Sequence, residues 1–363
     1  MNKKALRADI LLLLTAGIWG FGFVAQRSGM EYVGPFAYNG IRFILGSLSL
    51  VPLILFLRSK NAASEKNKSS GGSAPASSIR TFLLYSLIAG SCLFLAVILQ
   101  QFGIMFTTAG NAGFITGLYV IFTPIAGIFW GRKTGAATWI GSLLTLTGLY
   151  FLTAVSGSGA AGIGGTGGSG VNPGDVIVMV SAVFWTFHVL IIDRLVQKID
   201  PIVLSSGQFA VCGIYSLAGA FLAEPHIAAL AGSLDPGLVQ HGMFAWHPFP
   251  ALLAGIHNGT LTISSGAIIP ILYGGLASVG IAYTLQAVAQ RDAPPAHATI
   301  ILCFEGAFAA LGGVLLLGEK TGPRTLLGFA FMLIGMLVTQ WEVIAKKTNP
   351  PDPAKNGMAG EME

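Results

Sequence analysis

Ten long apolar segments constrain this chain more than any other feature of its sequence. Each has about 17 to 25 mostly apolar residues, and a helix needs roughly 20 to cross a bilayer core about 30 Å thick. The segments are about twice as long as a membrane-spanning strand and lack its alternating pattern. We therefore predict an all-α integral membrane protein with ten transmembrane helices, at residues 8–27, 35–57, 80–102, 108–130, 138–155, 175–196, 202–223, 267–290, 295–317 and 323–345.

The composition excludes most other classes of protein. Hydrophobic residues make up 53% of the 363 residues and charged residues only 10%, whereas an ordinary soluble domain has about 25% charged residues. A net charge of +5 would indicate a nucleic-acid partner only if Lys and Arg gathered on one face, but they lie mostly between the apolar segments. Cys92, Cys212 and Cys303 fall inside these segments without metal-ligand spacing. We expect a lipid bilayer as the environment, no nucleic acid, no metal and no cofactor; a homodimer stays open.

The distribution of Lys and Arg predicts the orientation in the membrane. With the N-terminus inside, sixteen Lys and Arg residues lie in the inner segments and three in the outer ones, which is the positive-inside pattern. Both termini are then cytoplasmic, in a multi-pass protein of the plasma (cytoplasmic) membrane. The first segment follows Lys3, Lys4 and Arg7 and could be taken for a signal peptide, but its full length favours a retained helix.

The two halves of the chain share one pattern of residues. At an offset of 166, Asp9, Trp19, Pro35 and Phe43 match Asp175, Trp185, Pro201 and Phe209; later in each half, an offset of 187 pairs five further residues, such as Gly131 with Gly318. Each half has five helices, an odd number, so the second half enters the membrane from the opposite side. The sequence therefore predicts two inverted five-helix repeats, with a substrate site at their interface near mid-bilayer.

This pattern also predicts the domain organisation. Residues 1–155 form the first repeat and residues 175–345 the second, which carries a long outer loop at 224–266. Between the repeats, residues 156–174 form a Gly/Ser-rich linker without secondary structure. Residues 346–363 form a disordered cytoplasmic tail.

Several short motifs, in their order along the chain, resemble those of a known family. They are the segment from Trp19 to Ala25, Pro35, the Ile41-Arg42-Phe43 triplet, Glu305, and Gly318-Glu319-Lys320 before Leu327-Gly328. In this arrangement the sequence resembles the EamA-type drug/metabolite transporters. The resemblance implies a ten-helix secondary transporter for small polar metabolites such as amino acids. Where the family often has Glu-Pro in its ninth helix, this chain has Glu305-Gly306, which predicts a straighter ninth helix.

Two charged residues lie deep inside predicted spans. A charge near the bilayer centre costs about 2.5 to 3.5 kcal/mol on insertion scales, so such residues normally face a cavity or a partner. Arg42 in the second span would anchor a carboxylate through its planar fork, or tie helix ends or Glu305 structurally. Glu305 in the ninth span would bind an amine or carry a proton, or pair with Arg42.

Other polar and aromatic residues complete the candidate site. Trp19 and Trp185 hold matching positions in the two repeats and would wall a common cavity, or simply pack. Helical spacing places further candidates beside them, with packing as the alternative for each. The predicted substrate-binding set is Trp19, Arg42, Asn111, Tyr119, Trp185, His188, Tyr283 and Glu305, with Gln26, Gln286 and Gln290 as weaker neighbours. We predict no catalytic residue and no metal ligand.

These observations predict a transporter and not an enzyme. The chain lacks a G-x-x-x-x-G-K-[ST] phosphate loop, so the driving force would come from a gradient or from a partner protein. The leading hypothesis is an exporter that works by alternating access. A transporter of phosphorylated or nucleotide-linked sugars is the alternative, but it calls for several cations in the cavity and only Arg42 lies deep in a span. A channel, a receptor or an intramembrane enzyme is the alternative from another class.

Overall fold

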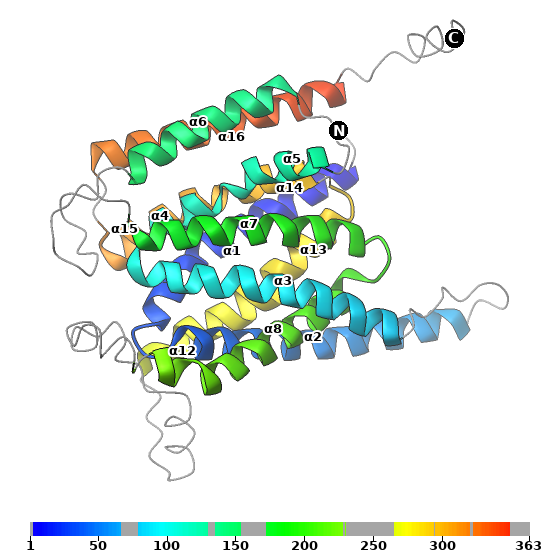
Figure 1. Cartoon of the computed structure of the whole chain (residues 1–363). Coiled ribbons are helices and arrows are strands. Elements are labelled where there is room, and N and C mark those ends of the chain that lie inside the picture. Colours follow the sequence, from blue (N-terminus) through cyan, green and yellow to red (C-terminus); the bar gives the residue numbers. More distant parts are fainter. Residues whose placement is uncertain are drawn as a thin grey trace, which may run out of the picture.

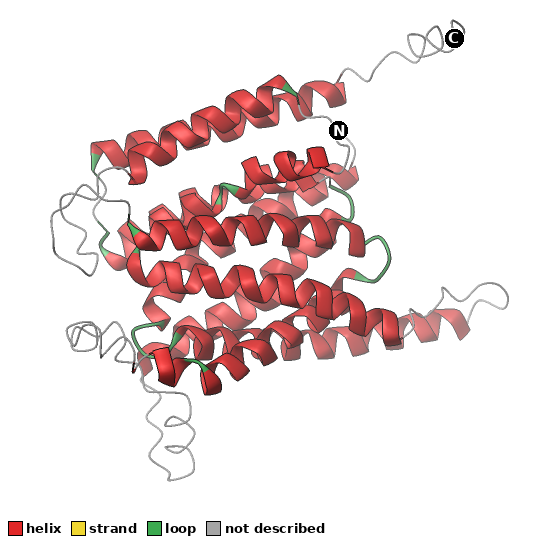
Figure 2. Ribbon diagram, in the orientation of Figure 1, coloured by secondary structure: helices red, strands yellow, loops and turns green. Residues whose placement is uncertain are grey.

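The computed structural model describes most of the chain, and all of its described elements are helices (Figure 2). The described residues are 3–66, 79–129, 135–153, 172–227, 229, 265–293, 295–319 and 322–348. The predicted linker and tail lie almost entirely outside these ranges, and so does most of the loop at 224–266.

The helices follow the ten predicted spans closely. Seven spans are single helices: α1 (Lys3–Gly29), α2 (Pro35–Lys66), α3 (Ile79–Phe106), α6 (Ala136–Thr153), α7 (Pro173–Leu195), α8 (Pro201–Leu222) and α16 (Pro323–Thr348). The other three are divided: α4 (Ala109–Thr116) and α5 (Tyr119–Phe129); α12 (Ser265–Leu272), η1 (Tyr273–Tyr283) and α13 (Thr284–Gln290); and α14 (Pro295–Leu302) and α15 (Phe304–Leu317). The prediction of an all-α membrane protein with ten spans is confirmed.

The surface of the molecule matches a lipid environment. Among the described residues, eight helical stretches are long and apolar enough to cross a membrane, and α6 and α16 contain shorter apolar stretches. Many large apolar side chains point outward, among them Leu14, Leu55, Phe56, Phe129, Leu143, Leu222 and Ile269. Apolar exposure on this scale is unfavourable in water and marks a membrane-facing surface.

Inverted symmetry governs which helices pack together. The pairs α6–α16, α4–α15 and α2–α8 each join equivalent spans of the two halves. The contact of α3 with α7 has its counterpart in the contact of α1 with η1, as a two-fold relation requires. In Figure 1, α6 and α16 lie side by side along one edge of the bundle. The chain is thus two inverted five-helix repeats.

The bundle has two ends, the N-terminal face and the far face. The N-terminal face holds the start of α1, on the right of Figure 1. The far face, on the left, holds the starts of α2, α4 and α7 and the ends of α8 and α15. Proline begins α2, α7 and α8, where its fixed φ suits the first helical position. Asn172 and Asp200 cap α7 and α8 by accepting bonds from backbone N–H groups.

Two interrupted spans cross at the centre of the molecule. The fourth span breaks after Thr116 and the ninth at Cys303, and these two positions match at the offset of 187. The Cys303 thiol donates a hydrogen bond to the Gly117 carbonyl at 3.1 Å. Discontinuous helices at a repeat interface leave backbone groups available near the membrane midplane.

The expectation of a straighter ninth helix is wrong. The ninth span is interrupted two residues before Glu305, although the proline that often follows this position is absent. Gly306 N–H bonds the Cys303 carbonyl at 3.1 Å, a tight three-residue turn. A Cβ on Gly306 would lie 3.2 Å from the Gly113 carbonyl, so close packing against α4 accompanies the break.

Candidate functional site

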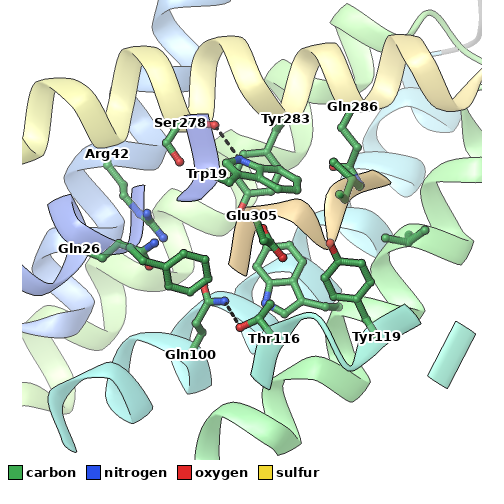
Figure 3. A pocket seen from close by; sticks show the side chains of 14 residues that line it. Trp19, Gln26, Arg42, Gln100, Thr116, Tyr119, Ser278, Tyr283, Gln286 and Glu305 are labelled. Carbon is green, nitrogen blue, oxygen red and sulfur yellow. Dashed lines mark hydrogen bonds between the residues drawn. The ribbon is translucent and has the colours of Figure 1, made fainter. Parts of the chain in front are cut away.

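A central cavity lies between the two repeats (Figure 3). Its volume is about 20 Å³, room for about one water molecule. Six of the eight predicted site residues line it. The lining consists of Trp19, Phe23, Gln26, Arg42, Gln100, Thr116, Tyr119, Trp185, Val189, Ser278, Tyr283, Gln286, Leu302 and Glu305. Both repeats therefore contribute to this cavity.

Arg42 is a buried cation without a countercharge among the described residues. Its side chain is 1% exposed, and its Nε donates a hydrogen bond to the Asn39 side-chain oxygen at 2.9 Å. The guanidinium carbon lies 5.3 Å from the Tyr38 ring centre and 5.0 Å from that of Phe43, close enough for cation–π attraction. In the described part of the chain no carboxylate, Glu305 included, lies within ion-pair distance of it.

Glu305 brings a buried carboxylate to the same cavity. It follows the break at Cys303 and lies in the first turn of α15, where the helix dipole favours a negative charge. The side chain is 3% exposed, and its Oε1 has no hydrogen-bond partner among the described residues. Tyr119, from α5 of the first repeat, lies on the same wall of the cavity.

Three aromatic rings form an apolar wall. Trp19 and Tyr283 have ring centres 4.5 Å apart, Trp185 and Tyr283 5.9 Å, and the two tryptophans 6.2 Å. Trp19 Nε1 donates to the Ser278 carbonyl in η1 at 3.2 Å (Figure 3). Trp185 Nε1 has no acceptor among the described residues. The wall thus offers flat apolar surface and one free N–H donor.

Unpartnered polar atoms are concentrated around this cavity. Within the described residues, five buried atoms lack a hydrogen-bond partner and belong to side chains that line it: Gln26 Oε1, Tyr119 Oη, Trp185 Nε1, Gln286 Nε2 and Glu305 Oε1. Leaving such an atom unsatisfied costs about 1 to 3 kcal/mol. Two acceptors, two donors and a hydroxyl that can do either are the expected arrangement for a polar ligand that supplies the missing partners.

The structure adds residues that the sequence did not single out. Gln100 donates to the Thr116 hydroxyl at 2.9 Å, just before the break in the fourth span (Figure 3). Ser278 lines the cavity from η1, an eleven-residue π-helical segment, and π-helical turns frequently occur at functional sites. An amide side chain inside an apolar run was the available signal for Gln100.

Two predicted site residues lie outside the lining of the cavity. His188 stands behind Trp185, with ring centres 5.7 Å apart, and its Nε2 bonds the Gln208 side-chain oxygen at 2.9 Å. Asn111 lies in the first turn of α4 at the far face, where its backbone N–H bonds Thr108. Helical spacing therefore did not predict how far along or behind the cavity wall these two residues lie.

The inverted repeats, the interrupted helices and the cavity between them define a multi-pass membrane protein built like a carrier. The model of the EamA-like transporter family matches residues 6–154 and 172–341, one match for each repeat. The chain therefore belongs to the EamA-like transporter family and is a membrane transporter.

Individual relatives agree with this membership. An uncharacterized transporter of Archaeoglobus fulgidus is 25% identical over 94% of this chain and 88% of its own length. The transporter YoaV of Bacillus subtilis, also uncharacterized, is 20% identical over 91% of this chain and 95% of its own. The WAT1-related protein At1g44800 of Arabidopsis thaliana is 25% identical over 59% of this chain and 53% of its own. A crystal structure with 15% identity aligns over 94% of this chain and 98% of its own, with a TM-score of 0.59, and it supports the fold.

Proposed function

We propose that this protein is a secondary transporter that exports small polar metabolites such as amino acids by alternating access. The observation that carries the proposal is a buried Arg42, without a countercharge among the described residues, in the same cavity as a buried Glu305. The N-terminal face is cytoplasmic, in accordance with the positive-inside rule, and the membrane is the plasma membrane. Transport, not catalysis, is the function that this cavity suits.

The charges of the cavity fit a zwitterion. A substrate carboxylate would accept bonds from the Arg42 guanidinium, whose planar fork suits that group. A substrate amine would bind Glu305, whose Oε1 is free of partners among the described residues. Trp19, Trp185 and Tyr283 would cover the apolar part of the substrate. Binding both charged ends at once would distinguish an amino acid from a sugar.

A second cavity supports loading from the cytoplasm. It has a volume of about 250 Å³ and lies at the N-terminal face between α1 of the first repeat and α8 and α13 of the second. Along α13, Gln286 lines the central cavity, while Arg291, just after the helix, lines this outer one. Gln290 lies between them and donates to the Val189 carbonyl at 3.2 Å. Substrate would pass this bond to reach the centre.

The central cavity must expand to hold a substrate. Ligand pockets in proteins usually enclose about 300 to 1,000 Å³, far more than the 20 Å³ observed. Helix movement between the repeats would supply the space, because both repeats line the cavity. In the proposed transport cycle, this arrangement would be a state in which the central cavity is nearly closed.

A counterflow screen with purified protein in proteoliposomes tests the proposed function. Vesicles loaded in turn with an amino acid, a nucleoside, a nucleotide-linked sugar or an organic cation are exposed to trace labelled substrate. We expect saturable counterflow with at least one zwitterionic amino acid. Exchange of nucleotide-linked sugars alone would favour the other transporter class. Flux without saturation or counterflow would indicate a channel and overturn the proposal.

Glu305→Gln tests proton coupling. The amide cannot release a proton at physiological pH but keeps the shape of the side chain, so we expect substrate accumulation driven by a pH gradient to be lost. Counterflow needs no driving force and should continue at saturating substrate, although a higher concentration is needed because the neutral amide cannot form an ion pair with the substrate amine. Glu31→Gln, at an exposed position in the turn before α2, is the matched control. Unchanged gradient-driven accumulation in Glu305→Gln would remove the coupling role.

A further inference from the structure

Glu224 connects the two repeats at the far face. It lies just after α8 of the second repeat and is 0% exposed. Its Oε1 accepts hydrogen bonds from the backbone N–H groups of Phe36 at 2.6 Å and Ala37 at 2.9 Å, in the first turn of α2 of the first repeat. A Cβ on Gly34 would lie 2.5 Å from this oxygen. The missing side chain at position 34 is therefore what lets the carboxylate reach the helix.

Glu319 makes the same kind of connection to another helix. It follows α15 of the second repeat, and its two oxygens accept bonds from the N–H groups of Ala109 at 2.8 Å and Gly110 at 3.3 Å, in the first turn of α4 of the first repeat. Gly318, with a φ of 65°, turns the chain in the left-handed conformation that favours glycine. This turn directs Glu319 back across the repeat interface.

These two carboxylate contacts differ from ordinary helix caps. The first N–H groups of a helix lack partners within the helix and usually bond to a neighbouring residue or to water. Here the acceptors come from the opposite repeat, 188 residues away along the chain for Glu224 and Phe36 and 210 residues away for Glu319 and Ala109. A carboxylate at a helix N-terminus is also favoured by the helix dipole. Each contact therefore holds the repeats together at the far face and is lost when they separate there.

The N-terminal face shows the opposite condition. There the cavity of about 250 Å³ separates the start of α1 from the start of α8 and the end of α13, which belong to the other repeat. The repeats thus enclose a cavity at one face and are bonded directly to each other at the other. Such an asymmetry is expected of an alternating-access carrier that is sealed more firmly at one face than at the other.

We propose that Glu224 and Glu319 are the residues that keep the far face of this transporter closed, and that release of α2 and α4 by these carboxylates opens it. This inference rests on the proposed alternating access. It assigns the two residues a positioning role, because neither lines the central cavity.

Cysteine accessibility measures this closure without a known substrate. With Cys92 and Cys212 replaced by alanine and Cys303 by serine, single reporters are placed at buried Ala37 and Ala112, below the two contacts, and at Leu11 on the wall of the N-terminal cavity. An impermeant maleimide then labels each reporter. Because this readout needs no transport, it holds even when the counterflow screen finds no substrate.

Truncation should open the far face, and the isosteric amide should preserve its closure. Hydrogen bonds to a charged acceptor are stronger than neutral ones, so their loss should be large. Glu224→Ala should speed labelling at Ala37→Cys, and Glu319→Ala at Ala112→Cys, each by at least about tenfold. Labelling at Leu11→Cys should stay constant or slow. Glu224→Gln and Glu319→Gln keep an oxygen acceptor and should remain within about threefold of the parent.

Three outcomes would overturn the inference. Unchanged labelling in both alanine variants, with intact folding, would show that the carboxylates do not close this face. Equal acceleration at Leu11→Cys would show general loosening of the bundle, as a merely structural bond produces. Equal acceleration in the glutamine variants would show that the acceptor oxygen is not the cause. If Glu224→Ala fails to fold, Glu319→Ala provides the test of the inference. Glu319 is only half-buried, so its truncation should disturb folding less.

Closure by Glu224 should also depend on pH. Burial raises the pKa of this carboxyl to about 7, against the opposing effect of the bonds from Phe36 and Ala37. From α2 only backbone amides face it, and no charged side chain among the described residues shifts its pKa. An opened, solvated glutamate has a pKa near 4.5, so the closed state binds the proton more tightly. Closure is then strongest below about pH 4.5 and weakens as the pH rises to about 7.

The pH effect is measured as a ratio of labelling rates. The rate at Ala37→Cys in the parent, divided by the rate in the Glu224→Gln background, should rise between pH 4.5 and 7, since the amide does not titrate. Both rates are measured at the same cysteine, so dividing one by the other cancels the pH dependence of the thiol's reactivity toward the maleimide. A ratio that stays flat or falls across this window would contradict the assigned sign.

Discussion

Arg42→Ala is expected to reduce the apparent affinity for a substrate carboxylate by about 30-fold or more. Removing one member of a buried charge pair costs about 2 to 5 kcal/mol, and each 1.4 kcal/mol is a factor of ten in binding. In this protein the guanidinium has no competing carboxylate among the described residues, so the whole interaction would be directed at the substrate. The measurement is the concentration dependence of counterflow in proteoliposomes.

Two comparisons separate this role from a structural one. Arg42→Lys keeps the charge but loses the planar fork, and we expect it to recover only part of the affinity. An analogue of the substrate without its carboxylate should bind parent and Arg42→Ala alike. Because Arg42→Ala also removes the bond to Asn39 and the contacts with Tyr38 and Phe43, the affinities are compared at a temperature where both proteins are folded. Undiminished affinity for the carboxylate substrate in Arg42→Ala would refute the anchor.

The sequence predicted the spans and the deepest site residues for simple physical reasons. Span length is fixed by the thickness of a bilayer, so the apolar runs located all ten helices, with ends within about five residues except for α2, which continues nine residues past its predicted end. The high cost of a charge inside a membrane selected Arg42 and Glu305. The offset between the repeats selected Trp19 and Trp185, because residues in equivalent positions meet at a two-fold axis. All four line the cavity.

Features that depend on contacts between distant segments could not be predicted in this way. The breaks at Thr116 and Cys303 arise where two spans cross, and neither position carries a proline that marks a break. The role of Ser278 is a backbone carbonyl in a π-helical segment, which side-chain patterns do not reveal. Glu224 and Glu319 follow apolar segments in the sequence and look solvated. Only the fold places them at helix starts of the other repeat.

Gly20→Ala is expected to destabilise the protein by about 1 to 3 kcal/mol, the usual cost of overpacking a closely packed interior. Gly20 lies where α1 crosses α15 of the other repeat. A Cβ at this position would overlap the Phe308 Cβ and lie 2.8 Å from the Glu305 carbonyl and 2.9 Å from the Ala309 nitrogen. Two of these three atoms are backbone, so a side-chain rotation cannot relieve the overlap and the helices must move apart.

Gly17→Ala is the matched control for this variant. Gly17 is on the same helix, about one turn earlier, but a Cβ there would find its nearest atom, Phe308 Cε2, at 4.0 Å. The substitution gains up to about 1 kcal/mol of helix propensity without a clash, so its melting temperature in detergent should equal or exceed that of the parent. Equal losses in both variants would mean that the α1–α15 contact is not the cause.

The position of Gly20 also predicts an effect on transport beyond the loss of stability. Besides the Phe308 Cβ, the new methyl group would press on the carbonyl oxygen of Glu305, at the start of α15. Trp19, the residue next to Gly20 in the chain, lines the same cavity as Glu305. Displacement of α15 moves the carboxylate relative to the aromatic wall. Even at a temperature where Gly20→Ala remains folded, its counterflow should therefore be weaker than that of Gly17→Ala. Equal counterflow at equal amounts of folded protein would show that the packing of α1 on α15 does not control the geometry of the site.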